Sequence, residues 1–133
     1  PRSGQPNTLQ LARVSTNQGQ TITTNVGRSL LRIPSQKAVS FVHKLSATEW
    51  QVESLDMSTL QTKKLIQTPV GSEDCAWTAD GTVLMAQGAK LYKWNPKLDT
   101  DWQLLADWSS LGIKQITRLT VNPKGTQLAF VGQ

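Results

Sequence analysis

Residues 75–86 read Cys-Ala-Trp-Thr-Ala-Asp-Gly-Thr-Val-Leu-Met-Ala, and this stretch decides the fold of the chain. Apolar residues alternate in its first arm, an Asp-Gly pair follows, and a Val-Leu-Met run forms its second arm. An Asp-Gly pair between two such arms is a strong local signal for a β-hairpin. We therefore predict a tight hairpin turn with Gly81 at positive φ, where a β-carbon would be penalised.

The hairpin pattern recurs along the chain. A second copy spans residues 116–130, and a weaker copy spans residues 30–41. Corresponding apolar positions in the three copies are Ile33, Trp77 and Val121, which are spaced by 44 residues. Self-similarity at this period is the sequence signature of a β-propeller, in which each repeat is one four-stranded blade.

The weaker copy differs from the others in its turn. Ile33 and Val39 are six residues apart, whereas Val121 and Leu128 are seven apart. We therefore expect the turn of the weaker copy to be one residue shorter, and this turn also lacks a glycine.

Short apolar or β-branched runs between the hairpins predict the remaining strands. These runs lie at residues 9–15, 21–24, 50–55, 64–66 and 90–94, with a last one near Leu105. No stretch has the apolar stripe of an amphipathic helix. Counting strands predicts two half blades and two complete blades, at residues 8–25, 26–69, 71–107 and 115–133 in chain order.

The outer strands of the units align as well. Equivalent positions in the third strands are Val14, Leu55 and Trp94. Equivalent positions in the fourth strands are Ile22, Leu65 and Leu105. We therefore predict an all-β fold with about three blades' worth of a propeller.

Both ends of the chain suggest that it is part of a longer repeat array. It begins at Pro1 and stops at Gly132-Gln133, at the end of an apolar strand. We expect no signal peptide within these residues, and no apolar run approaches the roughly 18 residues that a membrane span requires. We therefore expect no membrane span.

The formal net charge of +5 does not predict nucleic-acid binding. A nucleic-acid surface needs clustered basic residues with aromatic residues among them. Here the basic residues fall singly among acidic ones, and the nearest approach to a patch is Lys90, Lys93 and Lys97 around Tyr92 and Trp94. Solvated strand faces and turns account for this group, so we expect no nucleic-acid partner.

Reactive groups are few. The single cysteine, Cys75, excludes an internal disulfide and a cysteine-based metal cluster, and its place on an alternating strand predicts a buried thiol. The single histidine, His43, ends a predicted strand, and no Gly-x-Ser-x-Gly motif is present. Residues 99–101 offer two carboxylates, but a hard cation usually needs about six oxygen ligands. We predict no catalytic, cofactor or metal site.

Five tryptophans are the remaining candidate site residues. Trp77 and Trp94 occupy core positions of the repeat. The other three begin or flank strands and are candidates for an interface with a protein partner, because aromatic residues are enriched at such sites: Trp50, Trp102 and Trp108.

The repeat resembles the TolB-like, WD-repeat-like β-propellers of bacteria, whose motif reads apolar-x-apolar-Ser-Pro-Asp-Gly-x-x-Leu-x-Phe. Residues 122–130, Asn-Pro-Lys-Gly-Thr-Gln-Leu-Ala-Phe, match most closely, with Lys124 where the family usually has Asp. Residues 77–85 keep Asp-Gly but have Ala79 in place of proline, and residues 33–37 keep neither part of the turn. The resemblance extends from about Asn7 to Val131.

The resemblance implies a noncatalytic scaffold that binds a protein or peptide, as part of a longer exported bacterial protein in the periplasm or outside the cell. An alternative is the accessory propeller of a larger serine peptidase. Two half blades leave two ways to complete the ring, and both stay open: a homodimer, or the missing half of a parent propeller. Two copies would close a six-bladed ring.

Overall fold

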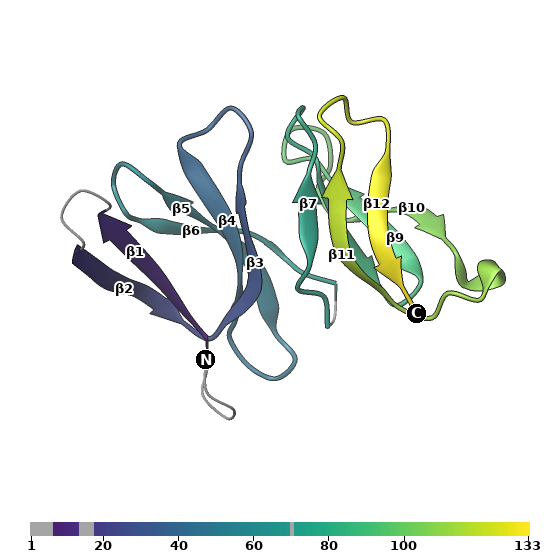
Figure 1. Cartoon of the computed structure of the whole chain (residues 1–133), viewed down its shortest axis with the longest axis horizontal. Helices are drawn as coiled ribbons and strands as arrows, with labels where there is room; N and C mark the ends of the chain where they lie inside the picture. Colours follow the sequence, from purple (N-terminus) through teal and green to yellow (C-terminus); the bar gives the residue numbers. More distant parts are fainter. Residues whose placement is uncertain (1–6, 14–17, 70) are drawn as a thin grey trace.

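A computed structural model describes residues 7–13, 18–69 and 71–133 of the chain (Figure 1). The described residues form twelve β-strands and one short 3-10 turn, η1 (Ser109–Leu111), so the predicted all-β fold is confirmed. No described helix is long and apolar enough to cross a membrane.

The strands form four antiparallel sheets that follow one another along the chain. The first hairpin consists of β1 (Thr8–Arg13) and β2 (Gln18–Thr24). The first sheet consists of β3 (Val26–Arg32), β4 (Ala38–Lys44), β5 (Trp50–Asp56) and β6 (Thr62–Gln67). The second sheet consists of β7 (Cys75–Trp77), β8 (Val83–Gln87), β9 (Lys90–Trp94) and β10 (Gln103–Asp107). The last hairpin consists of β11 (Ile116–Val121) and β12 (Leu128–Gly132).

The sheets pack face to face in chain order, with β3, β7 and β11 as neighbouring first strands (Figure 1). Three apolar clusters join them. Between the first hairpin and the first sheet lie Leu9, Val26, Phe41 and Leu55. Between the two four-stranded sheets lie Val42, Val52, Cys75, Val83, Met85 and Trp94. Between the second sheet and the last hairpin lie Leu84, Ala86, Leu91 and Ile116.

This stacking explains the continuous apolar run in β8. Successive side chains of a strand point to opposite faces. Val83 and Met85 therefore pack toward the first sheet, and Leu84 and Ala86 pack toward the last hairpin. A strand covered on both faces has no polar face, as its burial confirms.

The turn at Asp80-Gly81 forms as predicted, because Gly81 has a φ of 89°. Its amide donates to the carbonyl of Thr78 over 3.1 Å, and Thr78 and Thr82 close the hairpin. The positive φ falls on Gly81 but not on Asp80. The turn is therefore a three-residue loop with a glycine bulge, because a two-residue type I′ turn requires two positive φ values.

The expected short turn in the weaker copy is wrong. The Ile33 amide donates to the Ala38 carbonyl over 2.9 Å, and the Asn122 amide donates to the Gln127 carbonyl over 3.0 Å, so these turns have equal length. The shorter turn is the one closed by Thr78. The pairing also makes Arg32, and not Ile33 as predicted, the equivalent of Trp77 and Val121. The weaker copy keeps its chain reversal without glycine because Ser35 adopts a φ of 64°.

The fourth strands confirm one alignment and correct the other. Ile22, Leu65 and Leu105 each lie at a register shift, where the pairing between third and fourth strand skips one residue. The same shifts place Leu9, Val52 and Leu91 at equivalent positions of the third strands.

Counting from these positions, Ala12 is the equivalent of Leu55 and Trp94. The predicted equivalent, Val14, is therefore out of register by two residues, and Val14 itself lies outside the described residues. Alternation alone cannot detect a slip of two residues, because both registers place the same face toward the core.

Candidate binding groove

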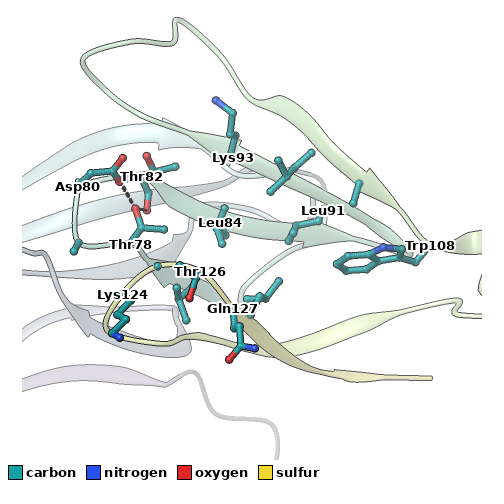
Figure 2. Close-up of a pocket in the computed structure, with 16 residues that line it drawn as sticks. Thr78, Asp80, Thr82, Leu84, Leu91, Lys93, Trp108, Lys124, Thr126 and Gln127 are labelled. Carbon is teal, nitrogen blue, oxygen red and sulfur yellow. Dashed lines mark hydrogen bonds between the residues drawn. The ribbon is translucent and has the colours of Figure 1, made fainter.

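A groove of about 550 Å³ lies between the second sheet and the last hairpin. Its floor is apolar and comes from three strands of the second sheet, with Leu84 on β8, Leu91 on β9 and Leu105 on β10. Trp108 lies at one end of the groove and Asp80 at the other, with Leu84 and Leu91 between them (Figure 2). An apolar floor with a few polar groups around it is the usual form of a binding site.

The polar rim is held by the two hairpin turns. Thr78 donates its hydroxyl to Asp80 Oδ1, and this hydrogen bond holds the pKa of Asp80 below its usual 3.8. On the other turn, Asn122 Oδ1 accepts the amides of Thr126 and Gln127 over 2.8 and 3.0 Å. Each turn is therefore fixed by its own side chains, so the rim is preorganised.

Two lysines add positive charge to the rim. Lys93 and Lys124 lie on opposite sides of the groove in Figure 2. The ammonium of Lys93 lies 3.4 Å from Asp99 Oδ2, which partly neutralises it. Lys124 extends from the β11–β12 turn and is exposed. Together with Asp80, they give the rim charges of both signs.

Trp108 is the predicted interface residue that the structure brings to the groove. Its ring stacks on Phe130 of β12, with centroids 4.9 Å apart and planes within 5°. Its backbone amide donates to the Ala89 carbonyl over 3.0 Å. Trp108 thus fixes the last hairpin to the second sheet while one part of its surface lines the groove.

Trp50 and Trp102 lie elsewhere, at the border of the cluster between the two four-stranded sheets. The indole of Trp50 donates to the Ser46 carbonyl over 3.0 Å, and the ammonium of Lys44 lies 4.4 Å from its ring centroid. The indole of Trp102 donates to the Gln67 carbonyl over 2.7 Å, which ties the second sheet to β6. The three tryptophans therefore do not form one surface.

The sequence analysis did not identify the leucines of the groove floor as candidate site residues. Leu84, Leu91 and Leu105 follow the strand pattern of buried positions, so their types alone did not mark them as binding residues. One signal was present in Leu104-Leu105, because two adjacent leucines in a strand cannot both face one side. Leu105 is 52% exposed, whereas its equivalents Ile22 and Leu65 pack against buried clusters.

The other candidates have structural partners. Cys75 is buried, and burial raises the pKa of its thiol to about 12. His43 Nδ1 lies 2.5 Å from Glu53 Oε2, which also accepts a hydrogen bond from Gln51 over 2.8 Å. Asp99 Oδ2 accepts the amide of Asn95 over 2.9 Å. Cys75 is therefore part of the core, the His43–Glu53 contact joins β4 to β5, and Asp99 holds the turn after β9.

A second charged cluster lies beside the first strands. The guanidinium of Arg28 on β3 donates to both carboxylate oxygens of Asp74, over 2.9 and 2.5 Å, and lies 3.4 Å from Glu73. Glu73 also pairs with Lys44 over 2.6 Å. The hydrogen bond from Arg28 lowers the pKa of Asp74 below 3.8. This network joins the first sheet to the segment that enters β7.

Comparison with known proteins shows similarity of fold. No protein-family model and no curated protein match this sequence. Among solved structures, TolB from Acinetobacter baumannii superposes with a TM-score of 0.69 over 95% of this chain, at 19% sequence identity. The chain spans 32% of the length of that TolB chain. This chain therefore has the fold of a segment of a TolB-like β-propeller.

Proposed function

We propose that this chain is a noncatalytic propeller scaffold that binds an extended segment of a protein partner. The observation that carries the proposal is the apolar groove beside an unpaired strand edge. Within the described residues, β12 pairs with β11 alone. Its other edge offers backbone amides and carbonyls to an added strand, a recurring mode of peptide recognition.

The groove and the strand edge suit the same ligand. A strand added to β12 presents alternate side chains to the second sheet, where Leu105 is 52% exposed beside the buried Leu91. Backbone hydrogen bonds supply affinity, and the apolar floor supplies selectivity for alternating sequences. Trp108 is the aromatic anchor of this site.

The proposal includes the setting of the chain. We propose that the chain comprises half blades at 8–25 and 115–133 and blades at 26–69 and 71–107. The likeness to TolB supports a longer exported bacterial protein that acts in the periplasm or outside the cell. Fractionating cells that produce the full-length protein tests this location.

The binding function is tested with fluorescein-labelled 12-residue peptides of alternating apolar and polar residues. Fluorescence anisotropy is measured with the chain at nanomolar concentration, where self-association is weakest. We expect binding by some peptides and at least tenfold weaker binding by Leu105→Lys, because the substitution places a charge on the apolar floor.

Leu98→Lys is the matched control, because Leu98 is 80% exposed and does not line the groove. It should bind the peptides as the parent chain does. Equal binding by the Leu105→Lys and Leu98→Lys variants would place the peptide site elsewhere and contradict the proposal.

A further inference from the structure

At each end of the sheet stack, an apolar side chain is exposed although the equivalent side chains in other sheets are buried. Val42 on β4 and Ala86 on β8 are 0% and 8% exposed, because the next sheet covers them. The pairing of each second strand with its first strand shows that Val131 on β12 is the equivalent of Val42 and Ala86. Val131 is 50% exposed, since no described strand lies on that face of the last hairpin.

The opposite end shows the complementary exposure. Leu30 on β3 pairs with Phe41 and shares its face, as Cys75 on β7 pairs with Met85. Cys75 is 3% exposed because the first sheet covers it, whereas Leu30 is 53% exposed. The first hairpin covers Phe41 but leaves Leu30 uncovered. Each end therefore presents an apolar face of the kind that packs between sheets.

The two hairpins are also complementary in their strands. The last hairpin corresponds to the first and second strands of a four-stranded sheet, and the first hairpin corresponds to the third and fourth. In both complete sheets, the second and third strands pair antiparallel. Among the described strands, β1 pairs with β2 alone and β12 pairs with β11 alone, so their outer edges are the two that a complete sheet would join.

We propose that the segment bound by the groove and the β12 edge is the first hairpin of a second copy of this chain. The inference rests on the proposed function, because it names the partner of the same site. β1 of the second copy pairs with β12, and its hairpin lies over Leu91 and Leu105. The free face of the last hairpin, with Val131, then packs on the first sheet of the second copy, where Leu30 lies.

Two copies complete one closed ring. Each contributes two four-stranded sheets, and each exchange of hairpins completes one more, which gives six sheets. Six lies within the range of about four to eight blades found in closed propellers. Closure removes the free edges of β1 and β12, which are otherwise open to indiscriminate strand pairing.

The complete sheets predict the register of the new pair. Ser40 pairs with Ser54, and Leu84 pairs with Lys93. The equivalent positions are Ala129 on β12 and Leu11 on β1. Ala129 of one copy should therefore face Leu11 of the other, at a distance that a disulfide can span.

The first test is the mass of the purified chain, measured by sedimentation from nanomolar to micromolar concentration. We expect a dimer of twice 14.6 kDa that dissociates on dilution. Val131→Lys should weaken the dimer at least tenfold, whereas Leu98→Lys should leave it unchanged. Circular dichroism checks that both variants stay folded.

The second test is cross-linking between mixed chains that carry Ala129→Cys and Leu11→Cys. Oxidation should join them, whereas Ala129→Cys mixed with Gln10→Cys should not cross-link, because Gln10 lies on the other face of β1. The native Cys75 thiol is buried and does not compete.

The outcomes separate the two proposals. A folded monomer at micromolar concentration, or a dimer without the Ala129–Leu11 cross-link, overturns the exchange of hairpins. If such a monomer still binds the alternating peptides, the binding function stands without it. A monomer that binds no peptide contradicts both.

Discussion

Val42→Ala tests whether packing between the two four-stranded sheets stabilises the fold. Val42 lies on β4 and is fully buried beside Val52 and Met85. The substitution deletes two carbon atoms, which is worth about 1.6 kcal/mol of transfer free energy at about 0.8 kcal/mol per carbon. The cavity that remains adds about 1 kcal/mol. We therefore expect the free energy of unfolding to fall by about 2–3 kcal/mol.

Urea denaturation followed by tryptophan fluorescence measures this change, because Trp94 belongs to the same cluster. A loss of this size corresponds to a fall of about 10 °C in Tm for a chain of this length. Leu98→Ala is the control. It removes more atoms, but Leu98 is 80% exposed, so we expect a loss below about 0.5 kcal/mol. If both variants lose the same stability, burial between the sheets is not the stabilising contact and the stacking is wrong.

Three further predictions follow from single residues. Gly81→Val should destabilise the fold by about 1 kcal/mol or more, because the φ of 89° penalises a β-carbon, and an unchanged Tm would refute this turn. Because the pKa of Asp74 is lowered, its ion pair with Arg28 stabilises the fold above pH 3.8, and this stability is lost as pH falls through the folded-state pKa. Asp74→Asn should therefore reduce the fall in the free energy of unfolding at acid pH. An unchanged fall would contradict this linkage. Cys75 should react with a thiol reagent at pH 8 only after unfolding, so rapid modification of the native chain would show that its strand is not buried.

Local chemistry made the hairpins predictable. Alternating apolar residues, an Asp-Gly turn and a repeat of 44 residues predicted strands, sheets and order, because side-chain alternation and turn conformation are properties of short segments. The positive φ of Gly81 and the burial of Cys75 followed from the same local reasoning. Ser35 did not, because a non-glycine residue at positive φ carries no clear mark in one sequence.

Tertiary structure decided what covers each apolar face. Leu65 and Leu105 occupy equivalent positions in their sheets, as the repeat predicted. Only the stack of sheets shows that Leu65 packs in a cluster while Leu105 lines a groove. The same holds for Val42 and Val131, which occupy one repeat position with opposite exposure. Burial of a side chain depends on neighbours that are distant in the chain. The repeat by itself therefore predicted the strands and their grouping, whereas the groove, the free edges and the position of Trp108 came only from how the sheets pack.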